Sequence, residues 1–425
     1  MNWNQGKTSL RWVAALAVVG LWTAAAHAAT ICDVRALGAK GDGVSKDTAA
    51  IQKAIDNCAA QGGGTVLFKA GTYVSAPILI KSNVTLHLDK DATLLGSPDH
   101  NDYPAKEEFH TPDRQPLVGA ENASNIAIEG EGTIDGNGQS WWDEARHVKD
   151  AGLLGNSPRP KLIILDHSRH IRIEGITIQN SPMWQLVPFY SDDIVIRNVR
   201  VLAPPRSPNT DAIDPFSSSN ILIEKVLADV GDDNIAIKSG PVNSPGPDDP
   251  SRNIIIRDCV FKHGHGLSIG SEISGGVHNV LAERISFEGT DNGIRVKSNR
   301  DRGNDVGNFV FRDITMKDVR NDIVLSEYYP KMMPPPEGAK AEPVTRLTPL
   351  FHDILIENLT ATGETNAGAI MGLPESPLQT VTLRNINIQA AKPLTIGYAQ
   401  VKMENVKVNV GAGEGVLKLA GSEVK

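Results

Sequence analysis

The chain has 425 residues, of which 40% are hydrophobic and 22% are charged, and it contains 39 glycines and 26 prolines. This composition is typical of a folded globular protein and excludes a disordered or collagen-like chain. The formal net charge of −8 at pH 7 argues against nucleic acid as a partner.

The first 28 residues have the pattern of an export signal. Lys7 and Arg11 precede an apolar run over residues 12–26, and Ala26-His27-Ala28 fits the small-x-small cleavage pattern. A membrane anchor is the alternative, but the run is short for a bilayer span. We therefore expect a signal peptide over residues 1–28 and one secreted or periplasmic domain over residues 29–425, without membrane contact after cleavage.

Three cysteines are too few for a disulfide framework, but export allows one bond between them. We expect Cys32 to pair with Cys58. Cys259 lies in the apolar stretch 254–261 and is expected to be a small buried hydrophobe. No spacing of cysteines and histidines resembles a zinc site.

Residues 47–59 predict a short amphipathic helix, because Ile51, Ala54, Ile55 and Cys58 fall on one helical face. We expect this helix to cap the N-terminal end of the repeats that follow. The tail after Gly411 is short and polar, so the sequence shows no equally clear cap at the other end.

A short strand-like pattern recurs from residue 83 onward: a polar residue is followed by alternating branched apolar residues. The repeats begin at Asn83, Asn125, His170, Asp193, Asn220, Asn253, Asn279, Asn308, Asp353, Thr380 and Gln400. Most successive starts are 20 to 33 residues apart. Such periodicity indicates a solenoid. The units are mostly strands and turns, so we expect an all-β, single-stranded, right-handed parallel β-helix; a propeller needs longer repeats of four strands.

Four motifs in the middle of the chain place polar residues where packing alone would not. They are Asn209-Thr210-Asp211, Gly231-Asp232-Asp233, Gly264-His265-Gly266 and Arg295-Val296-Lys297. Asp211, Asp232, His265 and Arg295 are separated by 21, 33 and 30 residues, each close to one coil. Stacked coils therefore predict that all four motifs lie on one face.

These residue types suit hydrolysis of a glycosidic bond. The reaction needs one protonated carboxyl group to protonate the leaving oxygen and one carboxylate to activate water. Crowding of Asp211, Asp232 and Asp233 raises the pKa of one of them, which supplies both forms at once. An isolated Asp-Asp pair would instead indicate a turn or a calcium ligand pair.

The other two motifs fit the same interpretation. His265 could hydrogen-bond the acid, although an isolated Gly-His-Gly more often forms a turn. Arg295 and Lys297 project to the same side of a strand, and Arg300 and Arg302 follow them. In so acidic a protein this local excess of positive charge indicates recognition of carboxylates on a substrate, with a solvated basic edge as the alternative.

With these four motifs in this order, the mature chain resembles the polygalacturonase (pectinase) family of inverting glycoside hydrolases. The resemblance implies that Asp232 is the general acid, that Asp211 and Asp233 activate and orient the water, and that His265 supports the acid. It further implies that Asn209, Arg295 and Lys297 bind the substrate. A tyrosine after the basic motif would also bind substrate; Tyr328 is the expected residue, with Tyr329 as the alternative.

The resemblance implies homogalacturonan (pectin) as the substrate, cleaved with inversion and without a metal or organic cofactor. We expect a monomer. Exo-acting cleavage is an alternative, since loops over residues 100–119, 139–160, 241–251 and 329–349 could block one end of a groove. A calcium-dependent pectate lyase or a non-catalytic polysaccharide-binding β-helix could share the same fold. Neither explains three crowded carboxylates beside a basic pair.

Overall fold

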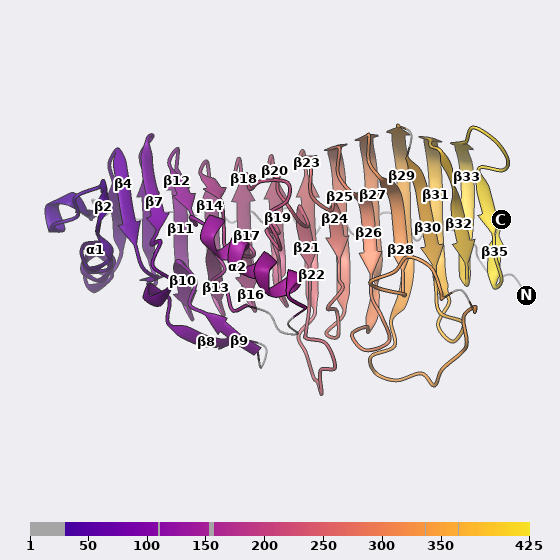
Figure 1. Ribbon diagram of the computed structural model, residues 1–425, viewed down its shortest axis with the longest axis horizontal. Helices are drawn as coiled ribbons and strands as arrows, with labels where there is room; N and C mark the ends of the chain where they lie inside the picture. Colours follow the sequence, from indigo (N-terminus) through magenta and orange to yellow (C-terminus); the bar gives the residue numbers. More distant parts are fainter. Residues whose placement is uncertain (1–29, 109–110, 153–156, 336, 364) are drawn as a thin grey trace, which may run out of the picture.

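The computed structural model describes residues 30–108, 111–152, 157–335, 337–363 and 365–425. These residues form one elongated stack of coils, in which the sheets that run along the stack are parallel (Figure 1). The predicted parallel β-helix is confirmed. The signal peptide predicted over residues 1–28 lies outside the described residues.

The largest sheet has 22 strands and runs along the whole stack. Its strands are β1 (Ile31–Asp33), β2 (Asp42–Lys46), β3 (Gly64–Phe68), β4 (Gly71–Ser75), β6 (Val84–Leu88), β7 (Ala92–Gly96), β11 (Ser124–Gly130), β12 (Thr133–Asp135), β14 (Arg169–Glu174), β15 (Thr177–Gln179), β17 (Asp192–Arg197), β18 (Arg200–Leu202), β19 (Ser219–Glu224), β20 (Leu227–Asp229), β22 (Ser251–Arg257), β23 (Val260–Lys262), β25 (Val277–Glu288), β27 (Asp305–Lys317), β29 (Leu350–Thr362), β31 (Leu378–Gln389), β33 (Ala399–Asn409) and β35 (Ser422–Val424).

Two smaller parallel sheets together make another face of the stack. The first contains β5 (Ile78–Ile80), β10 (Val118–Glu121), β13 (Ile163–Asp166) and β16 (Leu186–Phe189). The second contains β21 (Ile235–Ile237), β24 (Leu267–Ile269), β26 (Asn292–Lys297), β28 (Asn321–Ser326), β30 (Asn366–Met371), β32 (Lys392–Gly397) and β34 (Val416–Lys418). Single bridges from Ile213 to Leu186 and to Ile235 join the two sheets into one surface.

Inward-facing branched residues of successive coils stack on one another to form the core. Ile171 of β14 pairs with Ile194 of β17, which pairs with Ile221 of β19, and Ile221 pairs with Ile254 of β22. All four side chains are buried. A slip of one residue would turn each of these side chains outward, so their burial fixes the register of the coils.

The polar residue at the start of most repeats has a backbone role. Asn220, Asn253 and Asn279 have φ angles of 56°, 57° and 59°, a left-handed conformation that asparagine tolerates better than most residues. The Asn253 amide donates to the Asn220 side-chain oxygen at 3.0 Å, and Asn279 donates to Asn253 at the same distance. The asparagines therefore both turn the chain and tie neighbouring coils together.

A column of alternating charges, the charge ladder, crosses the large sheet with one residue on each coil. In register order it consists of Glu174, Arg197, Glu224, Arg257, Glu283, Arg312, Glu357, Arg384 and Glu404. Glu224 accepts hydrogen bonds from both Arg197 and Arg257, with Arg257 Nε at 2.7 Å. Opposite charges on adjacent strands stabilise this register. Residues of like charge lie two coils apart, so pairing a coil with the next coil but one would place like charges opposite each other.

The N-terminal end is capped as the sequence predicts. Helix α1 (Thr48–Ala60) buries Ile51, Ala54, Ile55 and Cys58 against the first coils. The tail beyond Gly411 continues the coils as β34 and β35.

The expected disulfide is present: Cys32 on β1 is bonded to Cys58 on α1, with their Cα atoms 6.1 Å apart. Cys259 is a free, buried thiol, as predicted. The disulfide joins the cap to the first strand of the stack.

Two of the segments expected to be loops contain regular structure. Residues 139–160 include helix α2 (Gln139–Asp150), so the expectation of a simple loop there is wrong. Its two tryptophans are buried; Trp141 stacks on His100, and Trp142 donates to the Ser181 carbonyl at 2.9 Å. The segment 100–119 contains the one-turn helix η2 (His100–Asp102) and an antiparallel hairpin of β8 (Ala105–Glu108) and β9 (Thr111–Arg114). A further one-turn helix, η1 (Arg35–Leu37), follows β1.

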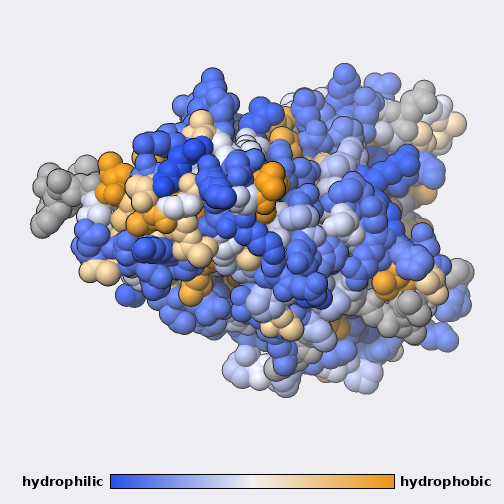
Figure 2. Space-filling view, turned by 60° about the vertical axis from the view of Figure 1, so that its left-hand side comes forward, coloured by the Kyte–Doolittle hydropathy of each residue, from blue (hydrophilic) through white to orange (hydrophobic). Residues whose placement is uncertain are grey.

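The surface is mostly hydrophilic on the face shown in Figure 2, where hydrophobic residues are scattered among polar ones. Within the described ranges, no helix is both long enough and apolar enough to cross a membrane.

The charge ladder generates a stability prediction. Burial alone would raise the pKa of Glu224, but hydrogen bonds from Arg257 and Arg197 outweigh it and hold the pKa below its ordinary value of 4.5. Glu224→Gln should lower the free energy of unfolding at pH 7 by about 1–3 kcal/mol, as measured by urea denaturation. A lowered folded-state pKa stabilises above the unfolded pKa and ceases to do so as the pH falls through the folded pKa. The difference between wild type and variant should therefore shrink on acidification.

Glu174→Gln is the matched control, because Glu174 lies in the same column with a side chain that is 33% exposed and 3.5 Å from Arg172. It should change the unfolding free energy by less than about 0.5 kcal/mol. Equal losses in both variants, or a Glu224 effect that is independent of pH, would contradict the role given to the two arginine hydrogen bonds of Glu224.

Candidate active site

The four motifs lie on successive coils of the face that contains β21, β24 and β26. Ile213, Ile235 and Leu267 stack in register on three adjacent coils. A motif residue stands two positions before each of them, namely Asp211, Asp233 and His265. On the next coil, Arg295 of β26 pairs with Ser268 of β24. The register of the stack therefore brings the motifs together, as their spacing predicts.

Three carboxylates of the motifs differ sharply in exposure. Asp211 and Asp233 are 3% and 1% exposed, whereas the side chain of Asp232 is 21% exposed. Burial, reinforced by the negative charge of Asp232, raises the pKa of Asp211 well above its ordinary value. A raised pKa favours the neutral, protonated form of this carboxyl group.

A fourth carboxylate, Asp214, belongs to the same group and was not singled out from the sequence. Its side chain is fully buried, and neither oxygen has a hydrogen-bond partner among the described residues. Burial raises its pKa well above the ordinary value, against the opposing charge of Lys238. The signal was present in the sequence, because Asp214 comes only three residues after Asp211.

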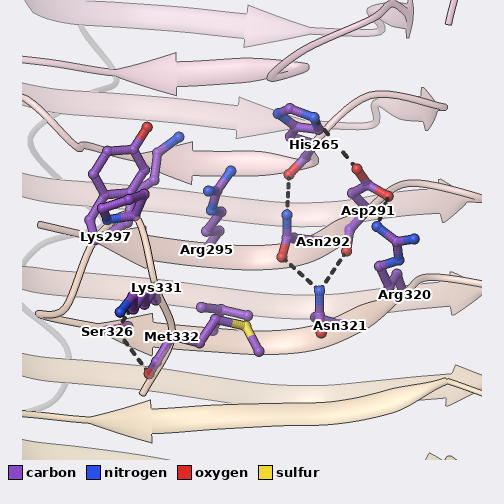
Figure 3. A pocket seen from close by; sticks show the side chains of 13 residues that line it. His265, Asp291, Asn292, Arg295, Lys297, Arg320, Asn321, Ser326, Lys331 and Met332 are labelled. Carbon is purple, nitrogen blue, oxygen red and sulfur yellow. Dashed lines mark hydrogen bonds and ion pairs between the residues drawn. The ribbon is translucent and has the colours of Figure 1, made fainter. Parts of the chain in front are cut away.

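His265 connects the acidic centre, which consists of Asp211, Asp214, Asp232 and Asp233, to the carboxylate of Asp291. Its Nδ1 lies 2.8 Å from Asp232 Oδ1, and its Nε2 lies 3.5 Å from Asp291 Oδ2. Arg320 Nη1 is 3.4 Å from the other oxygen of Asp291, and Figure 3 shows this row of three side chains. Burial lowers the pKa of His265, but the hydrogen bond and charge of Asp232 outweigh it, so the pKa is raised above 6.5.

The glycines on either side of His265 are required by the backbone. Gly264 and Gly266 have φ angles of 77° and 83°. A Cβ atom would lie 2.4 Å from the Asp232 carbonyl at position 264 and 1.9 Å from the Asn292 carbonyl at position 266. Only glycine allows the coils to approach this closely. The main chain of His265 also donates to the Asp232 carbonyl at 2.8 Å.

Asp233 forms ion pairs with both cations of the basic motif. Lys297 Nζ lies 2.7 Å from Asp233 Oδ2, and Arg295 Nη1 lies 3.4 Å from Oδ1. Ser268 Oγ donates to the same Oδ1 at 2.8 Å. Burial would raise the pKa of Asp233, but the charges of Lys297 and Arg295 hold it well below its ordinary value. The lowered pKa favours the ionised form of Asp233, whereas the raised pKa of Asp211 favours the protonated form.

The two arginines that follow the basic motif have separate partners. Arg300 pairs with Glu375 at 2.6 Å, and Arg302 pairs with Asp301 at 2.8 Å. Neither lines the cavity described below. The positive charge that faces a ligand is thus smaller than the sequence suggested, because one arginine pairs with a distant carboxylate, Glu375, and the other with its own neighbour, Asp301.

The two candidate tyrosines lie in different environments. Tyr328, the residue expected from the sequence, is 9% exposed and packs with Met371 and Leu373. The Tyr329 ring instead lies 6.0 Å from the Arg295 guanidinium and 5.5 Å from Lys297 Nζ, and it lines the cavity. Tyr329, the alternative residue, is therefore the one that lies beside the basic motif, and the binding role of either tyrosine stays a prediction.

A cavity of about 220 Å³ opens beside the motifs on the C-terminal side of the acidic centre. His265, Arg295, Lys297 and Tyr329 contribute to its wall. Figure 3 shows Arg320, Asn321, Lys331 and Met332 completing the lining from the following coils and from the loop after β28. Cationic and amide side chains dominate this wall, which suits an anionic, hydroxyl-rich ligand.

Asn209 lies on the N-terminal side of the acidic centre. It is exposed, has a φ angle of 58°, and accepts a hydrogen bond from Arg159 Nη2 at 2.7 Å through its side-chain oxygen. Asn209 and the basic motif therefore stand on opposite sides of the carboxylates along the stack.

Asp232, Asp233 and His265 are close enough to be considered as metal ligands, since one ligand atom from each lies within 4.8 Å of the others. The contacts of Asp233 argue against a metal, because Lys297 and Arg295 already supply positive charge to both of its oxygens. We therefore derive no chemical step through a metal.

Comparison with known families gives two matches. Residues 68–412 match glycosyl hydrolases family 28. Residues 31–101 match rhamnogalacturonase A/epimerase, pectate lyase-like. The first match spans all four motifs.

Similar proteins cover most of the chain. An endo-polygalacturonase of Pectobacterium carotovorum subsp. carotovorum is 31% identical over 95% of this chain and 100% of its own. A probable polygalacturonase of Vitis vinifera is 31% identical over 91% of this chain and 79% of its own. The crystal structure of a hyperthermoactive exopolygalacturonase from Thermotoga maritima superimposes with a TM-score of 0.74 at 27% identity, covering 92% of this chain and 91% of that one. This chain therefore belongs to glycosyl hydrolases family 28.

Proposed function

We propose that the protein is a polygalacturonase that hydrolyses α-1,4-galacturonosidic bonds of homogalacturonan (pectin) by a single displacement. One observation carries this proposal: the stacked coils bring Asp211, Asp232 and Asp233 together, with Asn209 on one side along the stack and Arg295 and Lys297 on the other. The names of the similar proteins support the same substrate class.

Asp232 is proposed as the general acid. It is the most exposed carboxylate of the three motif aspartates, and its Oδ1 shares a hydrogen bond with His265 Nδ1. The pair can hold one proton between these atoms and release it through Asp232 to the glycosidic oxygen as the bond to the anomeric carbon breaks. Asp291 and Arg320 hold the other side of the imidazole ring.

Asp233 is proposed as the base. Its lowered pKa keeps it ionised, so it can accept a proton from the water whose oxygen bonds to the anomeric carbon. Asp211, whose pKa is raised by burial, is proposed to orient that water by hydrogen bonding. The water attacks from the side opposite the leaving group, which inverts the configuration.

Arg295, Lys297 and Tyr329 are proposed to bind the galacturonate on the cavity side of the cleaved bond. Both cations reach the cavity wall while they contact Asp233. A substrate carboxylate there would therefore share its cations with the base. Recognition of the substrate and ionisation of Asp233 are coupled through the same two side chains.

We also propose how the chain is processed and where it works. Residues 1–28 are a cleaved signal peptide, and residues 29–425 are a single catalytic domain that works as a monomer outside the cytoplasm. The Cys32–Cys58 disulfide supports an oxidising compartment.

The acid assignment predicts the effect of Asp232→Asn. The amide has the same shape but cannot donate the catalytic proton, so kcat on polygalacturonate should fall at least about a hundredfold with little change in KM. Reducing-end release measures turnover, and proton NMR of the first products should show inverted anomers in the wild type. Asp229→Asn, on the same coil and paired with His263, should retain normal turnover. Turnover by Asp232→Asn close to the wild-type rate would refute the assignment.

The hydrogen bond between Asp232 and His265 predicts the basic limb of the pH profile. The raised pKa of His265 keeps the proton of the pair in place to above pH 6.5, so activity should decline only at higher pH. His265→Ala leaves the proton on a carboxyl group alone, whose ordinary pKa is about 4, so the basic limb of kcat should move to lower pH. His263→Ala, an exposed neighbour, should leave the limb in place. An unmoved limb in His265→Ala would show that His265 does not share the acid's proton.

The contact of Lys297 with Asp233 predicts two effects of Lys297→Ala. KM for polygalacturonate should rise, and the preference for unesterified over methyl-esterified pectin should weaken, because the ester removes the charge that Lys297 binds. The acid limb of kcat should also move to higher pH, since Asp233 loses the cation that most lowers its pKa. Lys331→Ala, which changes another residue of the cavity wall, should leave the acid limb unmoved. An unshifted acid limb in Lys297→Ala would show that Lys297 does not set the pKa of the group that acts as the base.

A further inference from the structure

Arg159 is a buried guanidinium next to the proposed site, and neither the motifs nor the proposed mechanism uses it. The residue is 6% exposed. Its Nη1 donates to the Pro182 and Pro208 carbonyls, both at 2.9 Å, and its Nη2 donates to Asn209 Oδ1 at 2.7 Å. One side chain thus holds two turns on successive coils, including the turn that leads into Asp211.

No carboxylate among the described residues lies within ion-pair distance of this guanidinium, and its Nε has no hydrogen-bond partner there. The two nearby lysines differ in this respect, because Lys161 contacts Asp113 and Lys238 contacts Glu272. Burial of a cation without a direct ion pair is costly and lowers the pKa of Arg159, although Asp113, Asp211 and Asp232 act on its charge from a distance.

The hydrogen bond from Arg159 also fixes which way the Asn209 amide faces. A guanidinium only donates, so the Asn209 oxygen must face Arg159 and the amide nitrogen must face away. The amide nitrogen makes no hydrogen bond to the described residues, and Asn209 is exposed. Asn209 therefore presents a hydrogen-bond donor, and no acceptor, on the side that faces away from Arg159.

We propose that Arg159 is a positioning residue that makes Asn209 an obligate donor to the carboxylate of the galacturonate bound on the Asp211 side of the cleaved bond. The inference rests on the proposed function, because only a polyuronate carries a carboxylate on both sides of the bond. The substrate is then held by its acidic groups at two places: by Asn209 and Arg159 on one side of the carboxylates, and by Lys297 and Arg295 on the other.

The central test is Asn209→Asp, which has the same shape but replaces the donor with an acceptor. The new carboxylate would pair with Arg159 and repel the substrate carboxylate, so KM for polygalacturonate should rise at least about tenfold while kcat changes less than about threefold. Asn209 is exposed, so this variant should fold, and circular dichroism and the thermal midpoint check that it does. A KM equal to that of the wild type overturns the proposal.

Arg159→Lys tests the positioning role, because lysine keeps the charge but cannot donate in a fixed fork to three acceptors. The KM of Arg159→Lys should also rise about tenfold. The KM of the double variant Arg159→Lys/Asn209→Asp should exceed the KM of the worse single variant by less than about threefold, because both changes act on one amide. Independent effects that multiply would overturn the proposal. If Arg159→Lys does not fold, the result for Asn209→Asp decides alone.

Arg206→Lys is the matched control. Arg206 is exposed, three positions before Asn209, and its side chain makes no hydrogen bond or ion pair with the described residues. Its KM should stay within about twofold of the wild type, as for most surface substitutions. Failure of the wild type to hydrolyse polygalacturonate would refute the proposed function itself. Normal wild-type turnover combined with an unchanged KM in Asn209→Asp refutes this inference alone.

Discussion

The stacking of Ile213, Ile235, Leu267 and Ile294 is the constraint on which the site depends. Because these side chains are buried in register, each coil must begin at a fixed place, and the polar residues just before them are carried to the same edge. The asparagine turns and the charge ladder enforce the same register from the outside of the core. Catalytic geometry in this protein is therefore a consequence of core packing repeated from coil to coil.

Burial and neighbouring charges shift the pKa values of the aspartates in the site in different directions. Asp211 and Asp233 are both buried, yet the pKa of the first is raised and that of the second is lowered. The difference lies in their neighbours, since Asp211 faces Asp232 whereas Asp233 faces Lys297 and Arg295. Lys297 and Arg295, which we propose to bind the substrate, also lower the pKa of Asp233, so a change to either side chain should alter affinity and chemistry together.

Arginine has a different task on each side of the site. Arg295 contacts Asp233, whereas Arg159 uses its planar fork to hold backbone carbonyls and one amide oxygen. A lysine could supply the same charge in either place, but it could not hold two turns and an amide at once. The arrangement on the Asp211 side depends on this geometry.

The sequence by itself determined the fold class and the convergence of the four motifs, because both follow from spacing along a repeat. It also indicated the capping helix through its amphipathic face, and it led us to expect the Cys32–Cys58 disulfide, which the structure contains. It could not decide between Tyr328 and Tyr329, since adjacent residues in a loop differ only in the side to which they point. It showed nothing of Arg159, Asp291 or the pairing of Lys297 with Asp233, which join residues up to 64 positions apart. Only the tertiary structure decided those, because the protonation of a carboxylate depends on which charges and how much solvent surround it in space.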